Sequence, residues 1–72
     1  MENSLDVKIS ENIKREIEQS GKSKSEIAKA IGVSKPTVSQ YVSGRIQPSL
    51  STLSKLCNFL NISADEILEI QP

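Results

Sequence analysis

The central residues 24–43 read KSEIAKAIGVSKPTVSQYVS and predict two short helices joined by a tight turn. Gly32 fits a backbone that leaves the first helix in a left-handed conformation, which is costly for any residue with a Cβ. Ser34 then stands where an N-cap of the second helix is needed. Apolar residues recur one turn apart on both segments, at Ile27 and Ile31 on the first and at Val38 and Tyr41 or Val42 on the second.

The second helix keeps a polar face once its apolar residues are turned inward. Ala28 stands where the two helices would cross, since a small side chain lets the backbones approach, and Val33 fills the corner between them. The residues left facing outward are Lys35, Pro36, Thr37, Ser39 and Gln40. We therefore expect this face to bind something outside the domain.

The segment resembles the DNA-binding helix-turn-helix of the phage repressor and Cro-like family, also called the XRE family. That family's pattern is filled here by Ile27, Ala28, Ile31, Gly32, Val33, Val38 and Tyr41. The resemblance continues through Gly44 and Leu53 to Asp65 and Leu68, and covers roughly residues 10 to 70. It implies an all-α fold, a compact five-helix bundle of the lambda-repressor type.

The N-terminal residues 1–9 are expected to form a flexible tail, followed by a DNA-binding domain over residues 10–72. An alternative is a short strand-like arm that pairs with a second subunit, because apolar and polar residues alternate at Leu5, Val7 and Ile9. The first helix is predicted from Ser10, its cap, to Ser20.

Serine caps predict the remaining helices. Ser23 and Glu26 form a capping box, and Pro36 fits the first turn of the helix over about 35–43. Ser49 opens the most apolar helix, expected to be the central post of the core and to end at Asn61, with Ile46 turned inward before it. A second capping box, Ser63 to Glu66, opens a last helix that carries Ile67, Leu68 and Ile70.

Composition limits the chemistry of the chain. It has 72 residues, one cysteine and no histidine, so we expect one domain, no metal, no cofactor and no catalytic residue. Cys57 reads as a small apolar residue inside a helix. No apolar run reaches the roughly 18 residues of a membrane span and no signal peptide is recognisable. The expected location is the cytoplasm, for a bacterial or phage-encoded protein associated with the nucleoid, and no effector-sensing domain is expected.

Net charge is zero, but the charges are unevenly distributed. Residues 22–55 hold six cations and one anion, a net +5, whereas residues 1–21 sum to −2 and residues 56–72 to −3. Association with a polyanion depends on the local field, so the basic middle favours a nucleic-acid partner. A charged surface that is merely solvated remains the alternative.

The helix over 35–43 is the candidate reader of the major groove of double-stranded DNA. Lys35 can donate to guanine, Gln40 can pair with adenine, and the Thr37 methyl or the Pro36 ring can lie against a thymine methyl, with Ser39 as a further candidate. The resemblance implies base contacts at Lys35, Pro36 and Gln40. The proline side chain has no hydrogen-bond donor, so Pro36 can offer a base only apolar contact. At this position the sequence therefore departs from recognition of bases by hydrogen bonds.

Phosphate contacts are expected at both ends of the helix pair. The free amides at the start of the helix that follows Ser23, together with Ser23 and Lys24, favour binding of an anion. The resemblance implies that Ser43 and Arg45 hold the opposite phosphates.

The predicted function is that of a sequence-specific DNA-binding transcriptional regulator, in particular a repressor. Two half-sites one turn apart call for a homodimer, and the resemblance places its surface near the last helices, where Leu68 and Ile70 are candidates. The rival interpretation is an antitoxin or another protein-interaction module on the same scaffold. Such a module would favour exposed aromatic residues and leucines, whereas the outward face of residues 35–43 is polar.

Overall fold

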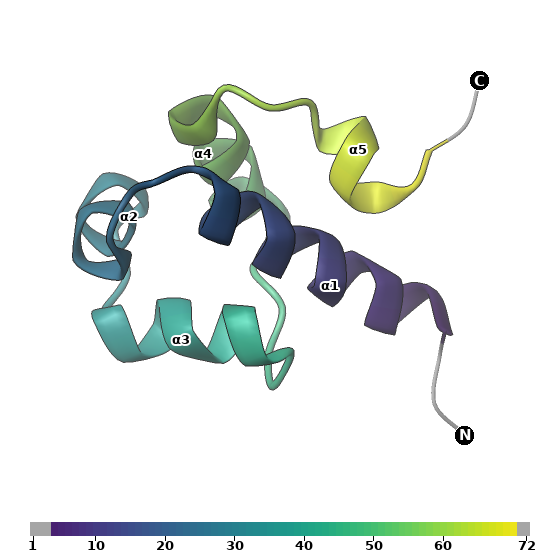
Figure 1. Ribbon diagram of the computed structural model, residues 1–72, viewed down its shortest axis with the longest axis horizontal. Coiled ribbons are helices and arrows are strands. Elements are labelled where there is room, and N and C mark those ends of the chain that lie inside the picture. The colour runs from purple at the N-terminus through teal and green to yellow at the C-terminus, as the bar shows by residue number, and fades with distance from the viewer. Residues whose placement is uncertain (1–3, 71–72) are drawn as a thin grey trace.

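The computed structural model describes residues 4–70, which fold into helices joined by short loops (Figure 1). The helices are α1 (Ser4–Gln19), α2 (Lys24–Ile31), α3 (Lys35–Ser43), α4 (Leu50–Leu60) and α5 (Ala64–Leu68). No strand occurs among the residues described. The prediction of an all-α fold with five helices is confirmed.

The helices pack as a closed ring. α1 contacts α3 and α5, α2 contacts α3 and α4, and α4 meets α5 (Figure 1). Each helix therefore has two main neighbours, in the order α1, α3, α2, α4, α5. The prediction that α4 is the central post of the core is wrong, because α4 is one member of the ring and its main neighbours are α2 and α5 alone. Leu50, at its start, is 80% exposed.

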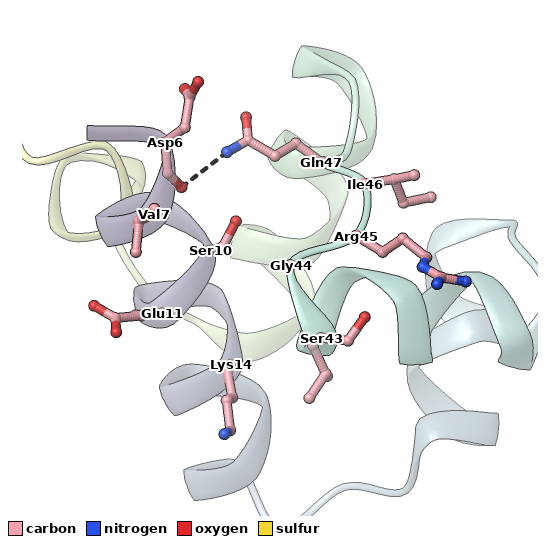
Figure 2. Close-up of a pocket in the computed structure, with 11 residues that line it drawn as sticks. Asp6, Val7, Ser10, Glu11, Lys14, Ser43, Gly44, Arg45, Ile46 and Gln47 are labelled. Atoms are coloured by element: carbon pink, nitrogen blue, oxygen red, sulfur yellow. Dashed lines mark hydrogen bonds between the residues drawn. The ribbon is translucent and has the colours of Figure 1, made fainter. Parts of the chain in front are cut away.

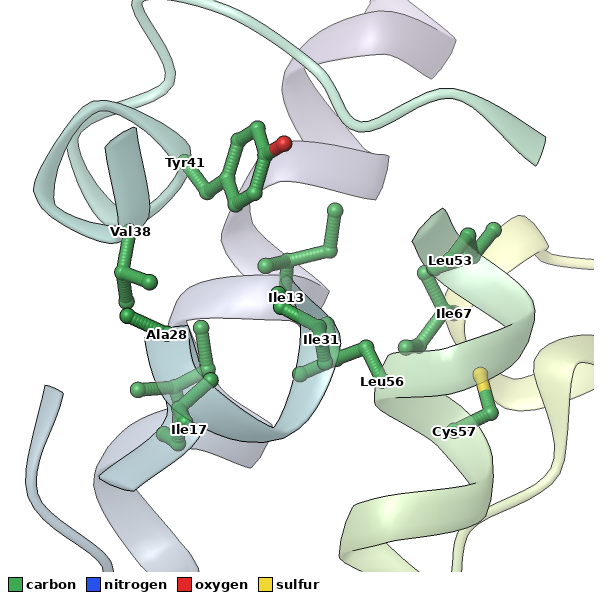
Figure 3. Packing of buried hydrophobic residues seen from close by; sticks show 11 residues of the cluster. Ile13, Ile17, Ala28, Ile31, Val38, Tyr41, Leu53, Leu56, Cys57 and Ile67 are labelled. Carbon is green, nitrogen blue, oxygen red and sulfur yellow. The ribbon is translucent and has the colours of Figure 1, made fainter. Parts of the chain in front are cut away.

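All five helices contribute to one apolar core inside this ring (Figure 3). The predicted one-turn spacings on α2 and α3 are confirmed as inward faces. Complete burial of one isoleucine or leucine contributes about 1.5–3 kcal/mol. The buried side chains are Ile13, Ile17, Ile27, Ala28, Ile31, Val38, Tyr41, Leu53, Leu56, Cys57 and Ile67.

The start of α1 differs from the prediction. The helix begins at Ser4 rather than after a cap at Ser10, so residues 4–9 of the expected flexible tail are helical; residues 1–3 lie outside the described part. Two tertiary contacts explain the extension. Ile9 packs against the core, and the Asp6 carbonyl accepts a hydrogen bond from Gln47 Nε2 at 3.1 Å.

The loop after α3 turns Ile46 outward. Gly44 adopts φ 79°, and the amides of Arg45 and Ile46 donate to the Gln40 carbonyl at 3.0 and 3.4 Å. Ile46 consequently lies 41% exposed, so the prediction that it enters the core is wrong.

The caps of α4 and α5 are confirmed in part. Ser49 caps α4, which ends at Asn61 in the left-handed region, as predicted. At α5 the Ser63 hydroxyl accepts from the Asp65 amide at 3.2 Å rather than from Glu66, so the second capping box is not formed. This bond two residues along the chain closes a tighter turn, typical of serine. α5 ends at Leu68, which leaves Ile70 beyond the helix.

A buried asparagine fixes α5 on α1. Asn12 is 5% exposed, and its Nδ2 donates to the carbonyls of Ile67 at 3.0 Å and Glu66 at 3.3 Å and to Glu69 Oε2 at 2.6 Å. Its Oδ1 accepts from Arg15 at 3.0 Å. Helix ends leave carbonyls without partners, so one side chain of α1 satisfies the end of α5.

Candidate nucleic-acid interface

The start of α2 has the predicted capping box. The Glu26 amide donates to Ser23 Oγ at 3.0 Å, and the Ser23 amide donates to Glu26 Oε1 at 3.2 Å. Glu26 is thus engaged in the cap. Both Ser23 and Lys24 are exposed, and the Ser23 hydroxyl accepts in this cap, so its own O–H remains a donor for an anion.

The corner between α2 and α3 depends on backbone conformation. Gly32 has φ 77° and ψ 31°, and its amide and that of Val33 both donate to the Ala28 carbonyl, at 2.9 and 3.0 Å. A Cβ on Gly32 would meet nothing within 4 Å, so the requirement for glycine comes from the positive φ rather than from lack of space. The predicted left-handed turn is confirmed.

The start of α3 is fixed by hydroxyl groups. Ser34 Oγ accepts from the Thr37 amide at 3.3 Å and lies 2.8 Å from Thr37 Oγ1. The two hydroxyls thereby set the side chain of Thr37. Pro36 sits in the first turn, where a missing amide costs no helical hydrogen bond.

The outward face of α3 is polar, as predicted. Lys35 and Pro36 are exposed, and Thr37, Ser39 and Gln40 are half-buried, whereas Val38 and Tyr41 are buried. All five predicted base-reading residues therefore remain accessible on the first two turns of one helix. They offer an ammonium, a carboxamide, hydroxyls and apolar surface, which are groups that recognise base edges.

The predicted phosphate-binding residues fall into two groups. Ser23 and Lys24 lie at the start of α2, and Ser43 and Arg45 lie at the end of α3, which runs away from α2 in Figure 1. Ser43 Oγ donates to the Gln40 carbonyl at 3.1 Å. Arg45 is exposed and forms no ion pair with the residues described. The structure thus separates the two groups along the helix pair.

A shallow hollow of about 560 Å³ lies where the end of α3 meets α1 (Figure 2). α1 and α3 approach closely there, since a Cβ added to Gly44 would lie 3.4 Å from Ser10 Cβ. The sequence analysis did not single out the α1 side of this hollow, because about thirty residues separate it from the α3 side and no local pattern joins them. The lining residues are Asp6, Val7, Ser10, Glu11, Lys14, Val42, Ser43, Gly44, Arg45, Ile46 and Gln47.

The candidate dimer residues differ in exposure. Leu68 is half-buried and packs against the core, whereas Ile70 is 55% exposed. A second hollow of about 280 Å³, between α4 and α5, is lined by Leu68 together with Leu50 and Cys57.

Cys57 is a free cysteine in α4. Cys57 is buried, as predicted, and burial raises the pKa of its thiol, with a smaller contribution from the charge of Glu16. Between residues 4 and 70, no three His, Cys, Asp or Glu side chains gather as metal ligands would. None of the helices in that part is long and apolar enough to cross a membrane.

A capped helix, a glycine corner and a second helix with an exposed polar face together define a helix-turn-helix domain. A helix-turn-helix family model matches residues 13–67. The chain belongs to this family, the Cro/C1-type (XRE) helix-turn-helix regulators, which are DNA-binding proteins and not an enzyme family. Searches of curated proteins and of solved structures returned no significant match.

Proposed function

We propose that this protein is a sequence-specific repressor of transcription that reads double-stranded DNA with α3. The observation that carries the proposal is the polar, accessible face of α3 on a fixed glycine corner. An α-helix fits the major groove of B-DNA, where each base pair shows a distinct set of donors, acceptors and methyl groups.

Base readout is assigned to the first two turns of α3. Lys35 donates to the O6 and N7 acceptors of guanine, and Gln40 pairs with the N6 and N7 edge of adenine. Thr37 and Pro36 supply apolar contact to thymine methyl groups. The bond between the Ser34 and Thr37 hydroxyls supports this role, because it holds the Thr37 side chain in one place before DNA arrives. Ser39, half-buried on the same helix, is the remaining candidate.

Phosphate contacts position α3 in the groove. Ser23 and Lys24 at the start of α2 would hold one strand, aided by the free amides of the helix N-terminus. Ser43 and Arg45 beyond α3 would hold the other strand. Cations at both ends of the helix pair support this division, because groove walls are lined by phosphates on both sides.

A homodimer would place two α3 helices in successive major grooves, about 34 Å apart. Ile70 is the exposed apolar residue nearest the end of α5, and Leu68, the last residue of that helix, is half-buried. Sedimentation with and without operator DNA measures the stoichiometry. A single subunit per operator, with no dimer at tens of micromolar, would remove this part of the proposal.

Repression itself requires only that the bound protein covers the promoter.

The experiment that tests the proposal is selection of bound fragments from random duplex DNA, followed by affinity measurements at several salt concentrations. We expect an inverted repeat, and a fall of log K with log salt of about 4 to 5 per subunit, for some five phosphate contacts. In a reporter assay, the selected operator placed over a promoter should lower transcription; increased transcription would contradict repression. If no duplex is retained at low salt, DNA binding is excluded and a protein partner becomes the target.

Substitutions separate the two kinds of contact. Lys35→Ala and Gln40→Ala should each cost about 1–3 kcal/mol on the operator and relax the preference at one position. Lys24→Ala and Arg45→Ala should weaken binding to operator and random duplex alike and reduce the salt slope by about 1. The matched control is Lys55→Ala, an exposed lysine of α4, which α2 separates from α3 in the ring. It should leave both quantities unchanged.

A further inference from the structure

The hollow between α1 and the end of α3 brings a lysine from α1 into the region assigned to phosphate. Lys14 lines this hollow together with Ser43 and Arg45 (Figure 2). The close approach of Ser10 and Gly44 places the two helices side by side here, and Lys14 follows Ser10 by one helical turn. Lys14 is exposed.

Ion pairing distinguishes Lys14 from the other cations of α1. Lys8 pairs with Glu69 at 3.6 Å, and Arg15 pairs with Glu16 at 3.1 Å and donates to Asn12. Lys14 forms no ion pair or hydrogen bond with any residue between 4 and 70. Its charge is therefore available to an external anion.

Two carboxylates also line the hollow and bear on its charge. Asp6 and Glu11 come from the preceding turns of α1. In Figure 2 their side chains point away from Ser43, and the Lys14 side chain extends from a later turn of α1, away from both carboxylates. Neither carboxylate lies within the 4.0 Å of an ion pair with Lys14.

We propose that Lys14 is a further phosphate-binding residue, which with Ser43 and Arg45 clamps the DNA strand at the end of α3. This inference rests on the proposed DNA-binding function and adds α1 to the interface. The ligand is a backbone phosphate, so the contact is independent of base sequence. The clamp would fix how deeply the C-terminal end of α3 enters the groove.

The test compares Lys14→Gln with Lys8→Gln, which removes the same charge from the same helix at a paired position. Lys14→Gln should reduce the salt slope by about 1 per subunit, on operator and random duplex alike. If wild type and Lys14→Gln bind with equal affinity at 1 M salt, this change of slope means that Lys14→Gln binds about tenfold more weakly than wild type at 0.1 M salt. Lys8→Gln should leave the slope unchanged, and Lys14→Arg should restore it. Thermal unfolding verifies that each variant is folded.

Ethylation interference gives a second measurement. Ethylating one phosphate on the strand beside α3 should weaken the wild type, and the same ethylation should have no effect on Lys14→Gln. A wild-type slope in Lys14→Gln, or an equal loss in Lys8→Gln, would overturn the assignment of Lys14 while leaving DNA binding intact. Failure of the wild type to bind any duplex would instead remove the proposed function itself.

Discussion

The α2–α3 unit and the α1–α5 pair are held together in different ways. In α2–α3 the caps and the turn are made by residues within a few positions of one another, such as Ser23 with Glu26 and Gly32 with Ala28. The α1–α5 pair depends on Asn12 and on atoms more than fifty residues further along the chain. Local bonds define the shape of the reading unit, whereas distant bonds attach the last helix to it.

This difference predicts which part of the domain should unfold locally first. A unit fixed by its own caps keeps its shape as long as the core holds it, whereas a five-residue helix is too short to be stable alone. α5 should therefore open at a lower free energy than α2–α3, as local units of proteins commonly do.

The largest expected effect comes from the core beneath the α2–α3 unit. Ile27 is fully buried, so Ile27→Ala should lower the free energy of unfolding by about 2–5 kcal/mol. Ile67, equally buried on α5, is the matched site, and Ile67→Ala should fall near the lower end of that range because a short helix can settle into the cavity. Urea unfolding measures both. A greater loss for Ile67→Ala would reverse the comparison.

A smaller effect is expected from the polar contact between α1 and α5. Asn12→Ala removes the donor to the Ile67 carbonyl and should cost about 1–3 kcal/mol. Amide hydrogen exchange should rise in α5 while α2 and α3 keep their protection. Gln19→Ala, at an exposed position of the same helix, should change stability by less than about 0.5 kcal/mol. Faster exchange spread evenly over all helices would show that α5 is not a separate unit.

The smallest effects compare two serine caps. Ser23→Ala breaks a reciprocal capping box and should cost about 1 kcal/mol, whereas Ser63→Ala removes one bond to a five-residue helix and should cost about half as much. Thermal unfolding of both variants, measured together, tests this order. Equal losses would mean that the missing box at α5 has no energetic consequence.

The reading unit could be predicted from sequence in detail. Local requirements of the backbone, a left-handed turn and two helix N-caps, are met by Gly32, Ser23 and Ser34. The structure places all three as expected. The one-turn spacing of Ile27 and Ile31 likewise identified their inward face. The predictions that were wrong concern the start of α1, the central place of α4, the burial of Ile46 and the second capping box. In each case helix packing, the course of a loop or a short turn decided the outcome.

The sequence by itself determined the helical class, the corner and the polar face of α3, because caps, glycine and helical spacing act between residues a few positions apart. Tertiary structure alone decided that α1 begins at Ser4, that Asn12 binds the end of α5 and that Lys14 lines the same hollow as Ser43. Each of these depends on two segments far apart in the chain meeting in space. The residue pattern within one segment does not indicate which distant segment will contact it, because only the packing of the whole ring of helices brings the two segments together.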